Sequence, residues 1–217
     1  TISACTFQTN TATNYGGGAI YFEPGTNGEI TGTAFVSNSA PTTGGAVICM
    51  QASANIADCT FVLNSTEGYG GAIYSQDGST LTLANCVFRD NDSEYSGGAI
   101  YNKDSSTATL TNCTLAGNTV AESGGAVFCG GAASILTNCI LWGNTPDALG
   151  GLPAAVSYSI VQGGASGTQV LDQDPLFVDL AGGDLQLTQD SPAIDRGTVA
   201  GAPATDILGV TRPQGSG

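Results

Sequence analysis

Two short motifs alternate along the first 152 residues, and their spacing constrains the fold more than any other feature of the chain. Gly-Gly-Ala followed by Ile or Val begins at Gly17, Gly44, Gly70, Gly97 and Gly124, with a degenerate copy at Gly150. Phe-x-x-Asn or Leu-x-x-Asn begins at Phe7, Phe35, Phe61, Phe88, Leu115 and Leu141. Both motifs advance by 26 to 28 residues per copy. Two motifs that keep this period in phase indicate a solenoid.

Each repeat unit predicts three short strands separated by bends. In one unit these strands are 80–83, 86–88 and 97–101, where apolar and polar residues alternate or follow a glycine pair. The unit is rich in Gly, Thr, Ser, Asn and β-branched residues, which disfavours helical repeats, and the frame of leucine-rich repeats is missing. Three strands in about 27 residues make one coil of a parallel β-helix, rising about 4.8 Å per coil. We expect an all-β domain with coils over residues 1–160 and an irregular capping region over 161–217.

Two bends of the coil carry asparagine at a fixed position. One set is Asn85, Asn112 and Asn138, with Asp58 in the same place. The other set is Asn10, Asn38, Asn64, Asn91, Asn118 and Asn144. Asn tolerates left-handed backbone, and amides stacked at the coil spacing can hydrogen-bond to one another. We interpret both sets as structural.

Five of the seven cysteines also share one repeat position. These are Cys5, Cys59, Cys86, Cys113 and Cys139, with Thr33 in the remaining copy. Small buried thiols pack well as weak hydrophobes, so unpaired stacked thiols are favoured, with disulfides as the alternative. Cys49 and Cys129 share another position but lie three repeats apart, which disfavours pairing.

Charge excludes several classes of partner. Four Lys and Arg residues stand against eighteen Asp and Glu, a formal net charge of −14. Nucleic-acid binding needs clustered cations, and anionic membranes repel such a chain, so we expect no nucleic-acid partner and no membrane insertion of this segment. No apolar run approaches the roughly 18 residues of a transmembrane helix. Because the chain starts at Thr1 inside a repeat, we interpret it as a piece of a longer protein.

The paired motifs over residues 1–152 resemble the repeats of chlamydial polymorphic outer membrane proteins and related bacterial β-helix surface proteins. The resemblance implies a right-handed parallel β-helix, secreted or on the cell surface of a bacterium or archaeon, in a family that includes adhesins. The segments 174–179, 183–187 and 191–197 resemble the region that closes many secreted bacterial β-helix proteins. This tail breaks the repeat period and is rich in proline, as expected of a cap on an open sheet edge.

The residue after each Gly-Gly-Ala-Ile/Val copy is large and mostly aromatic. The series is Tyr21, Ile48, Tyr74, Tyr101 and Phe128. Alternation along a strand would place it on the outer face of one sheet, where an exposed apolar stripe could contact a polysaccharide or a neighbouring subunit. The alternatives are that loops cover the stripe, or that these rings form the core.

Catalytic chemistry has little support, and we assign no catalytic residue. The chain has no His, the commonest general acid or base. Asp90, Asp92 and Glu94 lie close in sequence beside Arg89 and could bind Ca²⁺, but we favour a solvated loop face, because loops are normally polar. A second acidic group, Asp172, Asp174, Asp179 and Asp184, is explained by turn capping as well as by a metal. We therefore expect a non-enzymatic structural or adhesive module that needs no cofactor, with a polysaccharide-binding or polysaccharide-degrading module as the alternative.

Overall fold

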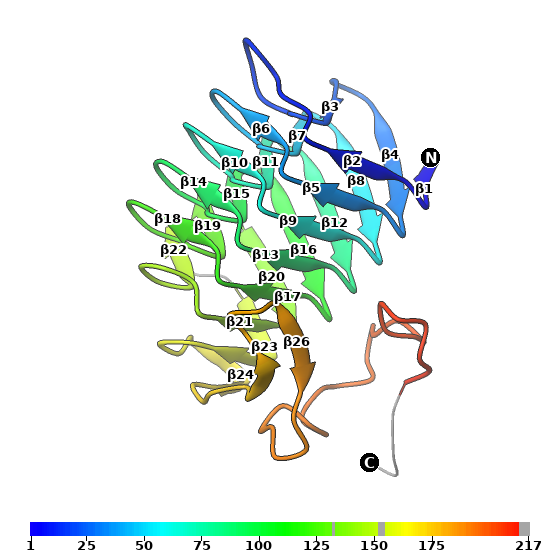
Figure 1. Cartoon of the computed structure of the whole chain (residues 1–217), viewed down its shortest axis with the longest axis vertical. Helices are drawn as coiled ribbons and strands as arrows, with labels where there is room; N and C mark the ends of the chain where they lie inside the picture. The colour runs from blue at the N-terminus through cyan, green and yellow to red at the C-terminus, as the bar shows by residue number, and fades with distance from the viewer. Residues whose placement is uncertain (132, 152–154, 213–217) are drawn as a thin grey trace.

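The computed structural model describes residues 1–131, 133–151 and 155–212, and it is a parallel β-helix with an irregular C-terminal segment (Figure 1). Every strand pair within the coils is parallel, and partners lie one repeat apart, as in Thr80 with Ser53 and Thr80 with Thr107. The predicted repeat period therefore equals the spacing, along the sequence, of residues that pair between neighbouring coils.

Four rows of strands run along the solenoid. The first row is β1 (Ile2–Ser3), β4 (Asn27–Thr31), β8 (Ser53–Ala57), β12 (Thr80–Ala84), β16 (Thr107–Thr111) and β20 (Ala133–Thr137). The second is β2 (Thr6–Gln8), β5 (Ala34–Val36), β9 (Thr60–Val62), β13 (Val87–Arg89), β17 (Thr114–Ala116) and β21 (Ile140–Trp142). The third is β6 (Ser39–Ala40), β10 (Ser65–Thr66), β14 (Asp92–Ser93) and β18 (Thr119–Val120). The fourth is β3 (Ile20–Phe22), β7 (Val47–Met50), β11 (Ile73–Gln76), β15 (Ile100–Lys103), β19 (Val127–Gly130) and β22 (Leu149–Gly151).

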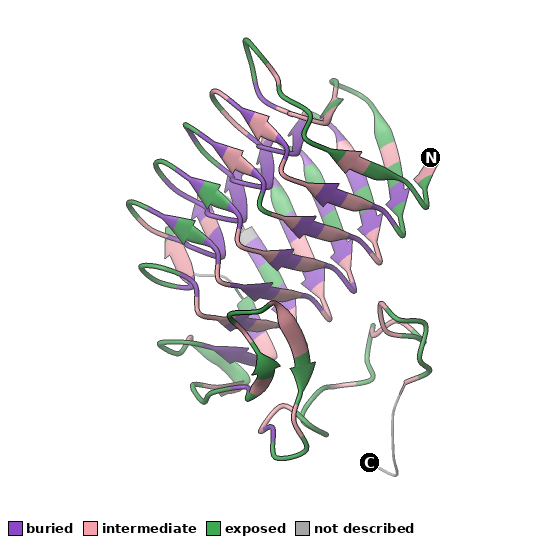
Figure 2. Ribbon diagram, in the orientation of Figure 1, coloured by how far each residue is buried: buried purple, intermediate pink, exposed green. Residues whose placement is uncertain are grey.

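The last coil joins two rows and ends the solenoid. β23 (Ala155–Val161) pairs with both β20 and β21, so the first and second rows form one sheet, and β24 (Gly167–Leu171) covers the free edge of β23. The two-residue strands of the third row lie where the sequence predicted a polar loop. In each of these strands the second residue is buried and the first is exposed or partly exposed, so they form a short fourth side of the coil (Figure 2).

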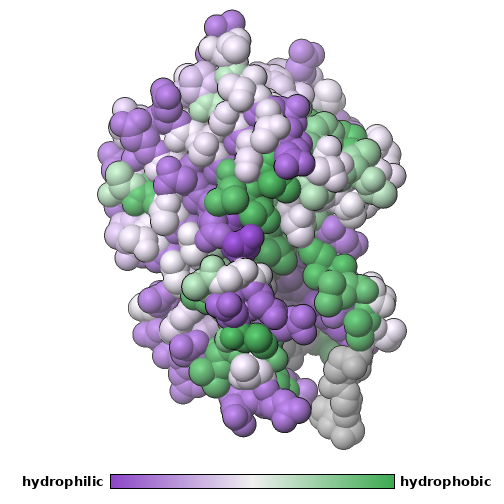
Figure 3. Space-filling model, viewed as in Figure 1, coloured by the Kyte–Doolittle hydropathy of each residue, from purple (hydrophilic) through white to green (hydrophobic). Residues whose placement is uncertain are grey.

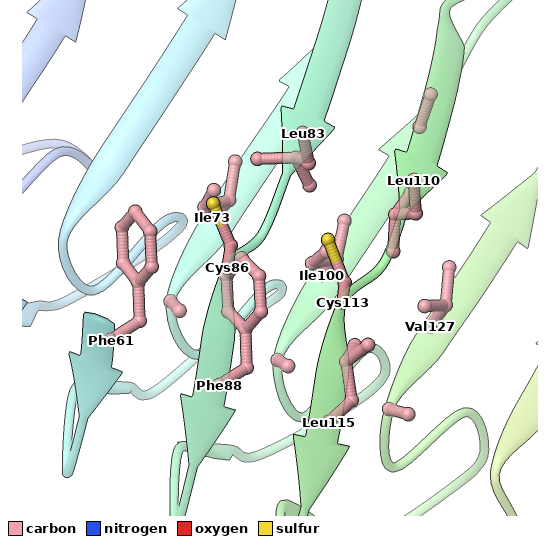
Figure 4. Packing of buried hydrophobic residues seen from close by; sticks show 14 of the residues in the cluster. Phe61, Ile73, Leu83, Cys86, Phe88, Ile100, Leu110, Cys113, Leu115 and Val127 are labelled. Atoms are coloured by element: carbon pink, nitrogen blue, oxygen red, sulfur yellow. The ribbon is translucent and has the colours of Figure 1, made fainter. Parts of the chain in front are cut away.

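The core is a set of stacks, each made by one repeat position. Phe35, Phe61 and Phe88 are fully buried, and successive ring centroids lie 4.6 Å apart with the rings nearly parallel. Leu115 continues this stack, while Ile73, Ile100 and Val127 form another (Figure 4). Residues that repeat once per coil therefore pack against copies of themselves, which is why the motifs recur.

The Phe-x-x-Asn asparagines form a continuous hydrogen-bonded ladder, as predicted. Asn64 Nδ2 donates to Asn91 Oδ1 at 3.0 Å and to the Phe35 carbonyl at 3.0 Å, and the Asn64 backbone N–H donates to the same Asn91 oxygen. The pattern repeats from Asn10 to Asn144. Each side chain thus satisfies buried backbone groups at a bend that could not otherwise be paired.

The glycine pair allows neighbouring coils to approach closely. Gly97 has a φ of +72°, a left-handed conformation that side chains disfavour. A Cβ on Gly98 would lie 2.4 Å from the Gly125 carbonyl oxygen. The prediction that this pair sits where a Cβ would clash is confirmed.

The C-terminal segment does more than cover the end of the solenoid. The hairpin β25 (Phe177–Asp179) and β26 (Asp184–Leu187) lies over the outer face of the second row, where Gly183 contacts the Arg89 guanidinium. Residues 198–212 then reach back to the bends of earlier coils (Figure 1). The expectation of a simple end cap is therefore incomplete, because most of the segment flanks the coils.

Candidate functional site

The series after the Gly-Gly motif forms one row on the outer side of the fourth row of strands. Strand register pairs Tyr21 with Ile48, Ile48 with Tyr74, Tyr74 with Tyr101, and Tyr101 with Phe128. The preceding residues, such as Ile73, belong to the main core, whereas Ile48, Tyr74 and Tyr101 form a separate small cluster. The row therefore points away from the coil interior.

An exposed stripe, however, is wrong for the middle of this row. Ile48 and Tyr74 are 4% exposed and Tyr101 is 9% exposed, whereas Tyr21 at the N-terminal end is 45% exposed. The rings stack on one another, with centroids 5.5 Å apart for Tyr74–Tyr101 and 5.0 Å for Tyr101–Phe128. Because these rings stack on one another, their faces are covered by the neighbouring rings and cannot stack on a sugar ring.

The loops that precede each glycine pair complete this burial. The Tyr69 ring lies 4.8 Å from the Tyr101 ring, centroid to centroid. The Tyr74 hydroxyl donates to Gln76 Oε1, and burial is the main cause that raises the pKa of both Tyr74 and Tyr101. The predicted contact stripe is therefore a second hydrophobic cluster that stabilises loops.

The exposed aromatic surface lies one layer further out, in those loops. Tyr69 and Tyr95, here called the tyrosine pair, are 36% and 40% exposed, and their ring centroids lie 5.3 Å apart at an angle of 36°. Their loops are tied coil to coil, because the Tyr95 N–H donates to the Gly68 carbonyl and the Glu122 N–H donates to the Tyr95 carbonyl, both at 3.1 Å. Sequence reasoning missed the pair, although each tyrosine lies one or two residues before a glycine pair.

Carboxylates border the tyrosine pair. Glu67 and Glu94 each lie three residues before a glycine pair, so they occupy the same place in consecutive loops, and both are exposed. Glu122 is exposed in the next loop, where it accepts a hydrogen bond from the Ser96 hydroxyl at 3.2 Å. The surface around the tyrosine pair is therefore aromatic with an acidic border.

The predicted grouping of Asp90, Asp92 and Glu94 is wrong. Asp90 forms an ion pair with Arg89 at a bend, and Asp92 lies on β14, where it accepts a hydrogen bond from Thr119. Asp90 has a left-handed backbone with φ of +55°, so the chain bends between this residue and β14. Among the described residues, no three His, Cys, Asp or Glu side chains are arranged to hold a metal ion.

The acidic residues of the C-terminal segment cap turns. Asp174 Oδ1 accepts the Leu176 N–H at 2.8 Å, and Asp179 Oδ1 accepts the Gly182 N–H at 2.9 Å. Asp184 Oδ1 accepts the Gln186 N–H in the same manner, whereas Asp172 Oδ1 accepts the N–H of Gly163 in the turn between β23 and β24. Of the two interpretations that the sequence left open, turn capping accounts for all four.

Comparison with known families decides the wider assignment. The family model described as the right-handed β-helix region matches residues 1–173. The chain belongs to the right-handed β-helix family. The match ends two residues after β24, where the coils of this β-helix end. No curated protein and no solved structure matches the chain.

The cysteines of this β-helix are free thiols, as predicted. Cys59, Cys86, Cys113 and Cys139 are buried, and each donates to the carbonyl two residues earlier at 3.1 to 3.4 Å. Burial raises the pKa of Cys86, Cys113 and Cys139, so these groups stay protonated and unreactive.

In the described part of the chain, no helix is long and apolar enough to span a membrane.

A cavity beside the only tryptophan of the β-helix brings together an aromatic ring and two carboxylates. It has a volume of about 420 Å³ and lies between β21 and the β25–β26 hairpin. Trp142, Asp174 and Asp190 line it, with Leu176, Phe177, Leu180 and Thr188. No Lys or Arg lines it, so it lacks the charge-stabilising cation that lyase chemistry requires beside a base.

Proposed function

We propose that this β-helix is a secreted or cell-surface structural and adhesive module of a bacterium or archaeon, without enzymatic activity. The observation that carries the proposal is the exposed tyrosine pair, held on loops that are hydrogen-bonded from coil to coil. Exposed aromatic rings on a rigid surface often mark contact sites. The pair replaces the buried middle of the Tyr21–Phe128 row as the contact surface.

A polysaccharide suits this surface better than a second copy of the chain. Sugar rings stack on aromatic faces, and sugar hydroxyls donate hydrogen bonds to carboxylates such as Glu67 and Glu94. Two copies meeting at this acidic border would bring like charges together, in a chain of net charge −14. Self-association therefore has an electrostatic cost that a neutral polysaccharide does not have.

The test is a binding screen of neutral polysaccharides against the intact chain and the Tyr69→Ala/Tyr95→Ala variant. Loss of binding in the variant supports the proposal. If neither protein binds but the two differ in self-association, the tyrosine pair is an assembly surface instead.

The Trp142 cavity supports a second candidate, a saccharide-binding module. Hydrolysis would require both carboxylates to flank a glycosidic bond, and Asp174 is already bound to the Leu176 N–H. Binding therefore fits this cavity better than cleavage. Because Trp142 is the only tryptophan, its fluorescence reports on this cavity alone. A saturable change on adding saccharide supports the candidate, and an unchanged spectrum at saturating saccharide contradicts it.

A further inference from the structure

The C-terminal segment is pinned to the solenoid at two bends. Asn138 Nδ2 donates to the Thr198 carbonyl, and the Thr198 N–H donates to Asn138 Oδ1, both at 2.8 Å. Asn85 Nδ2 donates to the Thr205 carbonyl at 2.9 Å, and Arg212 Nη1 donates to Asn85 Oδ1 at 2.6 Å. These contacts fix the segment along the bends without packing it into the core.

A cavity of about 540 Å³ lies between the segment and the coils, and most of its lining is apolar. The large aliphatic side chains of the lining are Ile140, Ile160, Leu171, Leu187, Ile194 and Val199. Ile194 is 44% exposed and Val199 is 78% exposed, so the cavity is open to solvent on the side of the C-terminal segment. Figure 3 shows hydrophobic patches on the face that carries β26 and the C-terminal segment, separated by hydrophilic ones. The volume of the cavity lies within the range of about 300–1,000 Å³ typical of small-molecule sites.

Half of the cations of the chain line this one cavity. Arg196 and Arg212 are two of the four Lys and Arg residues in a chain with eighteen acidic residues. The ion pairs of the described residues are made by Arg89 and Lys103, so neither cavity arginine has a carboxylate partner there. Asp195 is the one carboxylate of the lining. Guanidinium groups that lack a carboxylate partner and lie beside apolar walls are suited to a carboxylate that carries an apolar body.

We propose that this cavity binds a small amphipathic organic anion, a carboxylate with an aliphatic body. The carboxylate lies against Arg196 and the free N–H groups of Arg212, and the aliphatic body lies against Ile140, Ile160 and Leu171. This site is separate from the tyrosine pair and does not depend on the function proposed above.

The experiment is a calorimetric titration of the intact chain with octanoate, using 1-octanol as a probe of equal length without charge. Octanoate is expected to bind saturably and more tightly than 1-octanol. Arg196→Gln should weaken octanoate binding about tenfold, the loss expected for one charge-assisted contact. Lys103→Gln removes the same charge from β15, far from the cavity lining, and should leave the affinity unchanged.

A second variant separates the cavity from general surface charge. Ile194→Trp fills the cavity from a partly exposed position that the coil core does not use, and it should reduce octanoate binding without lowering the stability of the coils. The proposal is overturned if octanoate does not saturate the wild-type chain, or if Arg196→Gln and Lys103→Gln have equal effects. Undiminished binding by Ile194→Trp also contradicts it.

Discussion

Asn64 and Asn91, one coil apart, share a hydrogen bond in which the Asn64 side chain donates to the Asn91 side-chain oxygen at 3.0 Å. The same oxygen accepts the Asn64 backbone N–H at 3.0 Å, and both residues are fully buried. One amide therefore connects two coils through the side chain and the backbone together. The repeated Asn is a structural element of the solenoid, as the core phenylalanines are.

Replacing one member of this ladder should destabilise the coils. Asn91→Ala removes the bonds to the Phe61 carbonyl and to Asn118 and leaves the Asn64 N–H buried without a partner. We expect a loss of about 3 kcal/mol in the free energy of unfolding, measured from urea denaturation. Asn55→Ala, at an exposed position of β8, is the matched control and should change stability by less than about 0.5 kcal/mol. Equal losses in the two variants would contradict a structural role for the ladder.

The Tyr21–Phe128 row should respond to mutation as a core does. Tyr101→Ala removes a buried ring that stacks on both Tyr74 and Phe128, at an expected cost of about 3 kcal/mol. Tyr101→Phe keeps the ring and should cost less than about 1 kcal/mol. Tyr95→Ala, in the exposed pair, should also cost less than about 1 kcal/mol. Thermal unfolding of the three variants checks the order; a Tyr101→Ala protein as stable as Tyr95→Ala would show that the row is not packed.

Alkaline pH should destabilise the fold through its buried thiols. Burial raises the pKa of Cys49 from 9.0 to about 12. The unfolded thiol ionises above about pH 9 while the folded thiol stays neutral, so this contribution to stability is complete below pH 9 and is lost as pH rises toward 12. Urea midpoints measured from pH 8 to 11 should fall more steeply for the wild type than for Cys49→Ala. Parallel pH profiles would contradict burial of this thiol as the cause.

The features that repeat every coil were the ones that could be predicted from sequence. Phe61, Asn64 and Gly98 each contact the equivalent residue of the next coil, so the repeat period of these residues reflects contacts between coils. Alternation also placed Tyr74 on the outer side of its strand. Cover of this row by loops was one of the alternatives, but the sequence could not decide it, because the loops differ from coil to coil, as Tyr69 and Ser96 do at one position.

Two further errors have a physical cause in chain geometry. Asp90, Asp92 and Glu94 are close in sequence, but Asp90 pairs with Arg89 at a bend and Asp92 accepts a hydrogen bond from Thr119 in the next coil, so the three carboxylates do not converge. The pairing of Asn138 with Thr198 joins a side chain to backbone across 60 residues and belongs to no repeat, so no periodicity reports it. Sequence patterns describe the solenoid well and its single-copy contacts poorly.

The measurement that tests the proposed function most directly is polysaccharide binding by the wild type, Tyr69→Ala/Tyr95→Ala and Tyr15→Ala. Tyr15 is 77% exposed and lies outside the tyrosine pair, so its variant controls for loss of any surface ring. Stacking of one sugar ring on each tyrosine predicts a loss of at least about tenfold in affinity for the double variant and wild-type affinity for Tyr15→Ala. Equal affinity in all three proteins, with the fold intact by circular dichroism, would contradict the tyrosine pair as the contact surface.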